Sequence, residues 1–170
     1  MKTLIVIDMQ NDFINGTLGT KEAEKIVPVV KKKLDNYRLE SNNIIFTRDT
    51  HNEQYLNSFE GKNLPIPHCV EGTIGWQITD ELNVDELADT VINKPTFAWM
   101  GWYGFQFKDE IELCGLCTDI CVVSNALVLR GMYPDLKITV DAKACAGTTT
   151  EAHKAALQVM KSCQINVINE

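Results

Sequence analysis

Long hydrophobic runs are absent from the 170-residue sequence. No stretch approaches the ~20 consecutive apolar residues that a membrane-spanning helix requires. The apolar run at the start of the chain ends at Asp8, too short for the ~7–15-residue core of a secretory signal, and we interpret it as a first β-strand. Without an export signal, we expect a cytoplasmic protein in which the six cysteines are reduced thiols.

Positive charge is scarce as well: 16 Lys and Arg residues stand against 23 Asp and Glu residues, a formal net charge of −7. This balance argues against a nucleic acid or an anionic membrane as a partner, but it places no limit on a small-molecule substrate. The sequence also lacks internal repeats, low-complexity tracts and linkers. Because this length and a hydrophobic content of 45% suit one compact core, we expect residues 1–170 to form a single domain.

Short segments rich in β-branched residues alternate with helical patterns along the chain. The six expected strands are residues 3–7, 43–47, 89–93, 111–116, 136–140 and 165–169. Most of them are almost continuously apolar, as strands covered on both faces must be. The alternation predicts an α/β fold with three layers, α/β/α, in which helices cover both faces of a six-stranded parallel sheet.

Helical patterns occupy most of the intervals between these strands. We expect a helix at 28–38 that begins with Pro28, a weaker short helix at 74–82, a buried helix at 118–132, and a helix at 148–162 where Thr148 and Glu151 have capping-box spacing. In such a fold, ligands bind beyond the carboxyl ends of the strands. The residues directly after each strand are therefore the candidates for a functional site.

Ionisable or nucleophilic side chains directly follow each of the first four expected strands. They are Asp8, then Asp49 with His51, then Lys94, then the cysteines of the segment 117–121. Polar residues often end strands and cap helices, which would explain any one of them without a function. Four such groups at the same edge of the sheet favour an active site.

Cys121 is the candidate nucleophile of this group. It follows Thr118 and Asp119, both good N-cap types, and therefore lies in the first turn of the expected helix. A helix N-terminus favours thiolate over thiol, and its N–H groups can hold an oxyanion. A zinc site would need a second ligand pair, and a redox C-x-x-C motif would begin at Cys114, which lies in an expected strand. An inert buried cysteine is the remaining alternative.

A cysteine nucleophile needs a base, and the chain has only three histidines. His153 lies on the last expected helix, where we expect it to be exposed, and His51 and His68 flank a loop rich in other metal-ligand types. Asp8 is therefore the better base, with Lys94 as its electrostatic partner in a partly dry site.

Asp49, His51, Glu60 and His68 form a second group of candidates. Asp49 and His51 are two residues apart and point the same way on an extended chain. Two histidines with one or two carboxylates suit zinc, iron(II) or manganese. Asp and His residues are also common in loops without a metal, so this pattern alone leaves both possibilities open.

Taken together, these segments resemble the isochorismatase-like cysteine hydrolases and, within them, the nicotinamidases. The resemblance covers essentially the whole chain. It is carried by VIDMQNDF (6–13), TRDTH (47–51), PHCVEGTIG (67–75), Lys94 and GLCTDICVVSNA (115–126). It implies a six-stranded parallel sheet flanked by helices and a catalytic triad of Asp8, Lys94 and Cys121. It also implies a cis peptide bond between Leu116 and Cys117, with the backbone N–H groups of Cys117 and Cys121 forming an oxyanion hole.

The resemblance further implies a divalent metal, with zinc expected first and iron or manganese as alternatives, bound by Asp49, His51, His68 and Glu60. Phe13 would be the aromatic residue that packs against the substrate ring. The implied reaction is hydrolysis of nicotinamide to nicotinate and ammonia in NAD salvage, by an enzyme that forms a homo-oligomer.

Departures from the family pattern fall on the expected pocket walls. Lys94 is followed by the short segment PTFAWMGW, and His68 is preceded by Pro67 rather than by the common Trp-Pro-x. Another amide or an N-carbamoyl compound therefore remains an alternative substrate, and a non-catalytic binding or oligomeric partner is a further alternative. Trp99, Trp102 and Tyr103 are expected to line the pocket, to form a subunit contact or to lie in the core.

Overall fold

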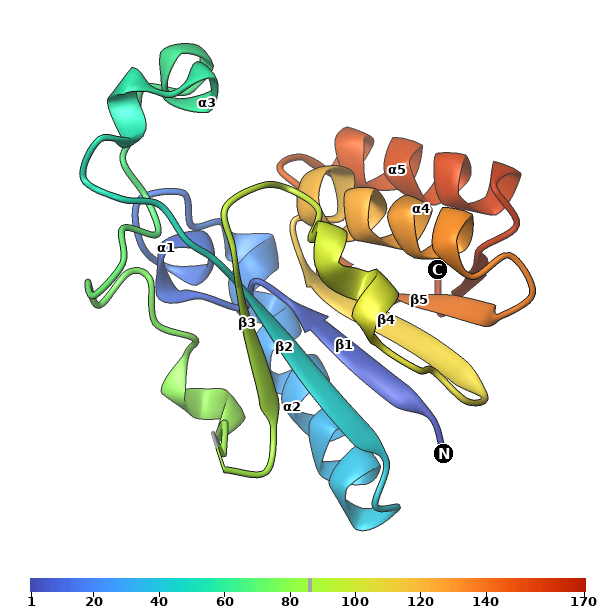
Figure 1. Ribbon diagram of the computed structural model, residues 1–170. Helices are drawn as coiled ribbons and strands as arrows, with labels where there is room; N and C mark the ends of the chain where they lie inside the picture. Colours follow the sequence, from blue (N-terminus) through green and yellow to red (C-terminus); the bar gives the residue numbers. More distant parts are fainter. Residues whose placement is uncertain (86) are drawn as a thin grey trace.

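A six-stranded sheet forms the centre of the computed structural model, which describes residues 1–85 and 87–170 (Figure 1). Its strands are β1 Thr3–Ile7, β2 Asn43–Asp49, β3 Thr90–Lys94, β4 Glu110–Leu116, β5 Lys137–Ala146 and β6 Asn166–Ile168. They pair in the order β3-β2-β1-β4-β5-β6, and every pair is parallel. The predicted parallel sheet is confirmed, and the strand ends lie within two residues of the expected ones, except that β5 runs to Ala146, six residues beyond its expected end at residue 140.

Helices cover both faces of this sheet. They are α1 Asn11–Ile14, α2 Lys21–Leu39, α3 Phe59–Asn63, α4 Val123–Met132 and α5 Thr150–Ser162. Helix α2 packs against the strands from one face, whereas α4 and α5 pack against each other and against β5 on the other face (Figure 1). The predicted three-layer α/β/α arrangement is therefore confirmed.

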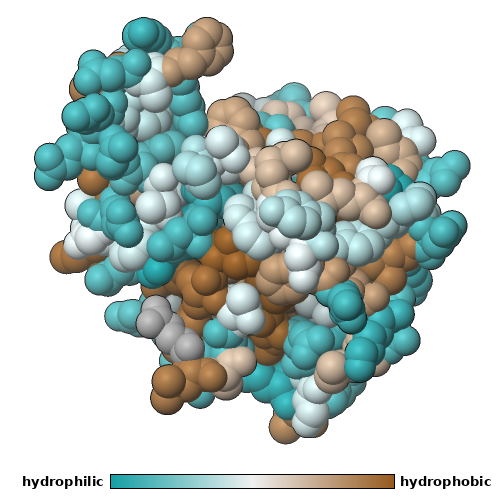
Figure 2. Space-filling model, in the orientation of Figure 1, coloured by the Kyte–Doolittle hydropathy of each residue, from teal (hydrophilic) through white to brown (hydrophobic). Residues whose placement is uncertain are grey.

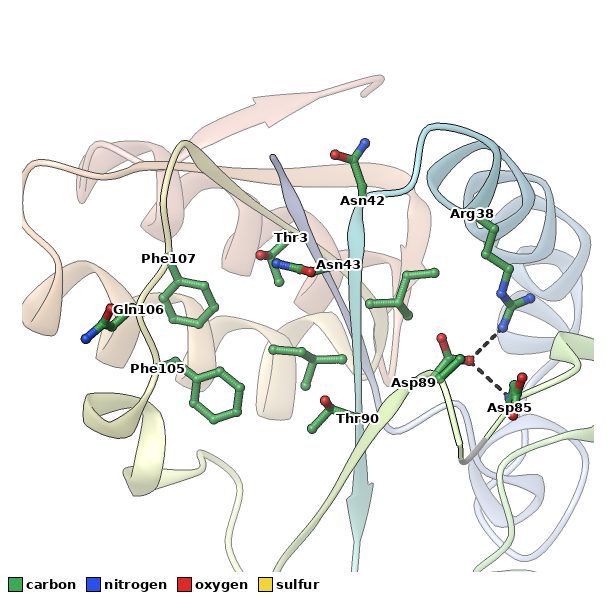
Figure 3. Close-up of a pocket in the computed structure, with 13 residues that line it drawn as sticks. Thr3, Arg38, Asn42, Asn43, Asp85, Asp89, Thr90, Phe105, Gln106 and Phe107 are labelled. Carbon is green, nitrogen blue, oxygen red and sulfur yellow. Dashed lines mark hydrogen bonds and ion pairs between the residues drawn. The ribbon is translucent and has the colours of Figure 1, made fainter.

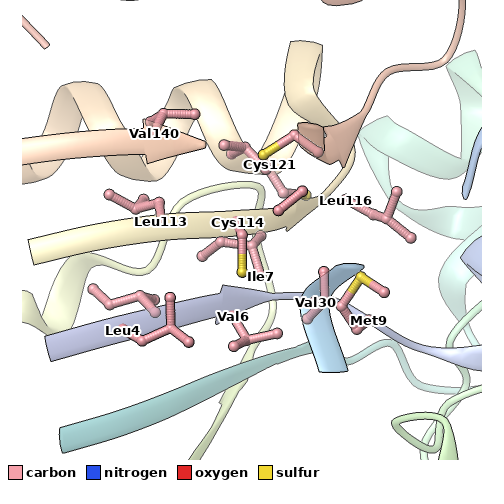
Figure 4. Packing of buried hydrophobic residues seen from close by; sticks show 14 of the residues in the cluster. Leu4, Val6, Ile7, Met9, Val30, Leu113, Cys114, Leu116, Cys121 and Val140 are labelled. Carbon is pink, nitrogen blue, oxygen red and sulfur yellow. The ribbon is translucent and has the colours of Figure 1, made fainter. Parts of the chain in front are cut away.

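The core consists mainly of strand residues. All five residues of β1 are buried, because β1 lies between β2 and β4 and is covered on both faces. Figure 4 shows side chains of β1 and β4 extending from both faces of the sheet, with Cys114 among them. Cys114 is completely buried, so its expected place in the core is confirmed.

Helix α2 begins earlier than expected. Thr20 is its N-cap, with a side-chain oxygen that accepts a hydrogen bond from the Ala23 N–H at 3.0 Å, and Pro28 lies inside the helix rather than at its first position. The residues on its buried face continue on both sides of Pro28: Ala23, Ile26, Val27, Val30, Leu34 and Tyr37. Burial of this continuous apolar face stabilises the helix across the proline, a tertiary effect that outweighs the local preference of proline for a first turn.

Two other expected helices differ from the structure. The segment 74–82 forms only a short 3₁₀ turn at Asp80–Leu82. The segment 118–132 is a π-helical turn at Thr118–Val122 followed by α4. At the last helix, the N-cap is Thr149 rather than Thr148, because the Thr149 side chain accepts the Ala152 N–H at 3.0 Å.

Residues 52–67, which include α3, project from the body of the molecule as a lobe beside the carboxyl end of β2 (Figure 1). The surface of this lobe is mainly hydrophilic, with an apolar tip (Figure 2). The helices described in residues 1–85 and 87–170 all fall short of the length and apolar character that crossing a lipid bilayer demands.

Candidate active site

The side chains predicted to meet at one edge of the sheet do lie there. Asp8 directly follows β1, Asp49 and Lys94 end β2 and β3, and Cys121 lies in the π-helical turn after β4. These four strands are neighbours in the sheet, so their carboxyl ends bring together groups that are more than a hundred residues apart in the chain.

Lys94 is the centre of the cluster and is completely buried. Its Nζ lies 2.7 Å from Asp8 Oδ2 and 3.5 Å from Asp49 Oδ1. The same Nζ lies 3.4 Å from Cys121 Sγ and donates to the Thr96 carbonyl at 3.1 Å. Burial alone would lower the pKa of Lys94, but Asp8, Cys121 and Asp49 more than offset burial and raise that pKa, so the group is an ammonium.

Asp8 is held by a residue that the sequence did not single out. The Thr47 hydroxyl donates to Asp8 Oδ1 at 2.6 Å, and the Asp8 N–H donates back to the Thr47 carbonyl at 3.2 Å. Asp8 has a φ of 46°, a left-handed conformation that few residues other than glycine adopt. Burial raises the pKa of Asp8, and Lys94 offsets only part of that rise. A buried carboxyl with a raised pKa is suited to accept and return a proton.

The expectation that a helix N-terminus keeps Cys121 as a thiolate is wrong. Burial raises the pKa of the Cys121 thiol well above its usual range, and the Asp8 charge raises it further, while Lys94 lowers it only in part. The sulfur is buried beside the Asp8 carboxylate, and a hydrogen bond to Asp8 also favours the neutral form. Cys121 is therefore a thiol at rest, and its activation needs a base.

Thr118 and Asp119 do not act as N-caps of the helix that carries Cys121. Cys117 is the capping residue and gives no side-chain hydrogen bond. Asp119 instead accepts the Thr148 N–H at 2.8 Å and its hydroxyl at 2.6 Å, and a 2.8 Å hydrogen bond joins Thr118 Oγ1 to His153 Nδ1. His153 is consequently half-buried rather than exposed.

The end of β4 and the turn that follows it have two unusual backbone features. The peptide bond between Leu116 and Cys117 is cis, as the resemblance predicts. Gly115 has a φ of +118°, and a Cβ at this position would lie 2.1 Å from the Ile7 carbonyl oxygen. Glycine is required here because β1 passes so close to the turn.

Asp49, His51 and His68 form a compact group in which one ligand atom from each residue lies within 4.8 Å of the others. His51 Nε2 is 2.9 Å from Asp49 Oδ2, and His68 Nε2 is 3.7 Å from the same oxygen. Glu60 Oε1, from α3 in the projecting lobe, lies 3.7 Å from both Nε2 atoms. The four predicted ligands are thus gathered around one point.

The donor set fits a divalent cation. Within residues 1–85 and 87–170, the buried His51 Nε2 is one of the side-chain atoms that make no well-aligned hydrogen bond, although it lies 2.9 Å from Asp49 Oδ2. His68 Nδ1 bonds the Ile66 carbonyl at 2.9 Å, which leaves Nε2 directed at the group. An orphaned imidazole nitrogen, a second imidazole oriented by a backbone carbonyl, and carboxylate oxygens are typical of zinc, iron and manganese sites.

Two residues from the start of the chain support this group. The Gln10 side chain accepts a hydrogen bond from the Asp49 N–H at 2.7 Å and donates one to the Asp49 carbonyl at 2.8 Å, so it fixes the backbone of one ligand residue by two hydrogen bonds. Asp12 Oδ2 accepts the Cys69 N–H at 2.7 Å, next to His68. Both residues lie within the segment VIDMQNDF (6–13), whose local pattern does not indicate these contacts.

Aromatic rings surround the histidines. Phe13 is buried with its ring centroid 5.5 Å from that of His68, so the predicted ring-packing residue lies beside the candidate metal group. Tyr55, which the sequence analysis missed, has its ring centroid 4.7 Å from His51 and 5.0 Å from His68. Its hydroxyl donates to the Leu64 carbonyl at 2.9 Å and so joins the segments before and after α3 within the projecting lobe.

The three aromatic residues left open by the sequence have different surroundings. Trp102 is completely buried and belongs to the core, Trp99 is partly buried against it with ring centroids 4.9 Å apart, and Tyr103 is 81% exposed. Trp102 is thus assigned to the core, whereas Tyr103 is a surface residue.

A cavity of about 500 Å³ lies at the other end of the sheet (Figure 3). Thr3, Asn43 and Thr90 line it, and each is the first residue of its strand. Ligands of parallel sheets bind at the opposite, carboxyl ends, and the polar side of this cavity is occupied by the 2.8 Å ion pair between Arg38 and Asp89. The cluster around Lys94 is therefore the candidate active site.

Comparisons with known proteins find similarity along almost the whole chain. A family model described as the isochorismatase domain matches residues 2–170. A nicotinamidase of Schizosaccharomyces pombe is 28% identical over 98% of this chain and 92% of its own length. A protein of Arabidopsis thaliana named a probable inactive nicotinamidase is 30% identical over 94% of this chain and 87% of its own.

Solved structures are similar over the same extent. The crystal structure of a pyrazinamidase of Pyrococcus horikoshii in complex with zinc superposes with a TM-score of 0.85. It is 28% identical in sequence, and the match covers 99% of each chain.

Proposed function

The chain belongs to the isochorismatase family, and from that premise we propose that it is a cysteine-dependent amidohydrolase that converts nicotinamide to nicotinate and ammonia. One observation carries the proposal: a completely buried lysine ammonium that contacts both the Asp8 carboxylate and the Cys121 sulfur. The similarity to nicotinamidases along almost the whole chain supports the choice of substrate.

In the first half of the proposed reaction, Asp8 takes the proton of the Cys121 thiol, and the sulfur attacks the carboxamide carbon. The backbone N–H groups of Cys117 and Cys121 hold the resulting oxyanion. The protonated Asp8 then gives its proton to the departing nitrogen, the C–N bond breaks, and ammonia leaves a thioester on Cys121.

In the second half, Asp8 takes a proton from a water molecule, which attacks the thioester. The C–S bond breaks, the proton returns from Asp8 to the sulfur, and nicotinic acid leaves and gives its remaining acidic proton to water to become nicotinate. Lys94 remains an ammonium throughout and stabilises whichever of its two neighbours is negatively charged, an interaction that is strong because the site is buried.

We further propose that Asp49, His51 and His68, with Glu60, hold zinc, with iron or manganese as alternatives. When bound, the metal would act as a Lewis acid toward the pyridine ring of the substrate. Phe13 would pack against that ring. The side chains of Gln10 and Asp12 would keep the ligand residues in place, because they accept hydrogen bonds from the backbone N–H groups of Asp49 and of Cys69, the residue after His68.

We also propose that the enzyme is a cytoplasmic homo-oligomer of single-domain subunits and that it acts on a small amide in NAD salvage. Light scattering of the purified protein measures the mass of the assembly, and a monomer at micromolar concentration would contradict the oligomeric part.

The function is tested by ammonia release from nicotinamide, compared with an N-carbamoyl amino acid and with an aliphatic amide. We expect kcat/KM to be highest for nicotinamide, because a ring nitrogen directed at the metal group and a flat ring beside Phe13 add binding energy that the other amides lack. A preference for an N-carbamoyl compound would contradict nicotinamide as the substrate but leave the proposed role of Cys121 unchanged. No hydrolysis of any amide would favour the non-catalytic alternative.

Removal of the metal is expected to lower nicotinamide hydrolysis while the fold is retained. Purified protein should contain close to one divalent ion per chain. The His51→Asn variant should not retain the ion, and its kcat/KM should fall by about 100-fold or more. Changes to residues that only support the metal ligands already lower affinity or activity by about 10- to 100-fold. His153→Asn is the matched control, since this histidine lies on α5 and bonds Thr118 instead. Metal-free protein with full activity would contradict the metal proposal.

A further inference from the structure

Asn125 is a buried polar residue that the proposed reaction does not use. It lies in α4, four residues after Cys121, and its side chain is completely inaccessible to solvent. All of its hydrogen-bonding capacity is taken up: Nδ2 donates to the Cys121 carbonyl at 2.8 Å and to the Phe97 carbonyl at 3.0 Å, while Oδ1 accepts from the Trp99 N–H at 3.0 Å and from Trp102 Nε1 at 2.9 Å.

These four bonds join two segments that meet at the active site. One is the turn that carries Cys121, and the other is the segment 97–102 that follows β3 and Lys94. The link reaches Lys94 directly, because Lys94 Nζ donates to the carbonyl of Thr96, the residue before Phe97. A continuous path of hydrogen bonds, joined by the backbone of the single residue Phe97, therefore runs from Cys121 through Asn125 to the ammonium of Lys94.

We propose that Asn125 is a positioning residue that sets the 3.4 Å spacing between Lys94 Nζ and Cys121 Sγ by tying the backbone of Cys121 to the segment after Lys94. The inference rests on the proposed function and deepens it. Asn125 acts through its neighbours and contacts no reacting atom. Its Nδ2 group does this work, since both of its acceptors, the Cys121 and Phe97 carbonyls, adjoin the site.

The Oδ1 side of Asn125 faces the aromatic core instead. Tyr133 also holds the segment that contains Trp102, because its hydroxyl lies 2.6 Å from the Trp102 carbonyl and 2.8 Å from the Phe105 carbonyl. Tyr133 thus anchors the same segment from the side away from Cys121. A variant of each residue separates the positioning of the site from the stability of the segment.

The test compares Asn125→Asp with Tyr133→Phe. Asn125→Asp keeps the size of the side chain and the acceptor facing Trp99 and Trp102, but it replaces the Nδ2 donor by an oxygen that faces two carbonyls. Tyr133→Phe removes one hydroxyl from the far side. Both variants should unfold at lower temperature than the wild type, so kinetics are measured well below either midpoint.

Two readouts are taken: kcat and KM for nicotinamide, and the rate at which iodoacetamide alkylates Cys121, followed by peptide mass. Asn125→Asp is expected to lower kcat by about 10- to 100-fold with KM changed less than about threefold, because displacement of reacting groups by an ångström has effects of this size. Tyr133→Phe is expected to keep kcat within about threefold.

Alkylation distinguishes positioning from simple loosening. If the Lys94 ammonium is displaced from the sulfur, Cys121 of Asn125→Asp is alkylated more slowly than in the wild type, since less thiolate is stabilised. If the change only loosens the fold, the buried sulfur becomes more accessible and is alkylated faster. Alkylation at or above the wild-type rate, or a kcat within twofold of wild type, would overturn the inference.

Asn125→Ser provides a second variant if the aspartate does not fold. Serine is neutral and can bond the Cys121 carbonyl one turn back, but it is too short to reach the segment 97–102, so the same loss of kcat and the same slow alkylation are expected. A wild type that does not hydrolyse nicotinamide would refute the proposed function. The alkylation rates would still decide the role of Asn125, because they need no turnover.

Discussion

Replacing Cys121 with alanine is expected to abolish hydrolysis of nicotinamide, with kcat lowered by about 10⁴-fold or more, the scale of loss when a catalytic nucleophile is removed. The thiol is the only group of the cluster that can form the acyl intermediate, since Asp8 and Lys94 are paired with each other at 2.7 Å. Folding should be little affected, because the substitution removes one sulfur atom from a buried site. Ammonia release and thermal unfolding measure the two effects.

Cys163→Ala is the matched control for this variant. Cys163 directly follows α5 and is half-buried, and its removal should leave kcat unchanged. Residual activity of Cys121→Ala near the wild-type level would remove the nucleophile from the proposed reaction and leave its chemistry without support.

Asp8→Asn is expected to lower kcat by about 10²- to 10⁴-fold, the usual contribution of general acid–base catalysis. The amide has the same shape but cannot take the thiol proton, and Cys121 is a neutral thiol at rest because burial raises its pKa. In the wild type, burial also raises the pKa of Asp8. Activity should therefore fall on acidification at a higher pH than the ordinary aspartate value of about 3.9 would give.

Asp141→Asn serves as the control for loss of a buried ion pair. Asp141 Oδ2 lies 2.7 Å from Lys33 Nζ, the same separation as Asp8 from Lys94, but on the face covered by α2. Both variants should lower the unfolding temperature, and only Asp8→Asn should lower kcat in protein that remains folded. Equal losses of kcat in the two variants would assign the effect of Asp8 to stability.

The residues that carry the proposed chemistry were predictable because parallel topology is a strong constraint. Once the sequence indicates strands covered on both faces, the residues after each strand must meet at one edge of the sheet. Asp8, Asp49, Lys94 and Cys121 follow from that rule without knowledge of any contact.

The residues that hold these side chains in place could not be predicted from the order of the strands. Thr47, Gln10 and Asn125 are buried polar side chains inside apolar segments, and nothing in their local pattern states which backbone group each one bonds. Their partners lie in other elements, as the sequence separation of 39 residues from Gln10 to Asp49 illustrates. Such contacts depend on the packed structure, whereas periodicity reports only burial.

The expected helix N-caps and the expected protonation state of Cys121 were wrong because contacts between distant elements decide both. Thr118, Asp119 and Thr148 have the side chains of N-cap residues, yet they bond across elements to His153 and to each other, and Thr149 caps α5. The thiol of Cys121 was expected to ionise at a helix terminus, but the structure places it beside the Asp8 carboxylate in a dry site. Burial and a neighbouring charge outweigh the helix dipole there.

The most direct test of the central claim is covalent trapping with pyridine-3-carbonitrile, the nitrile that corresponds to nicotinamide. A thiol adds across the C≡N bond to give a thioimidate, with the thiol proton transferred to nitrogen, so the mass of the chain rises by that of the nitrile. We predict one adduct per chain on the peptide that contains Cys121, absent from Cys121→Ala and strongly reduced in Asp8→Asn. An adduct on another residue, or one that persists in Cys121→Ala, would contradict the account.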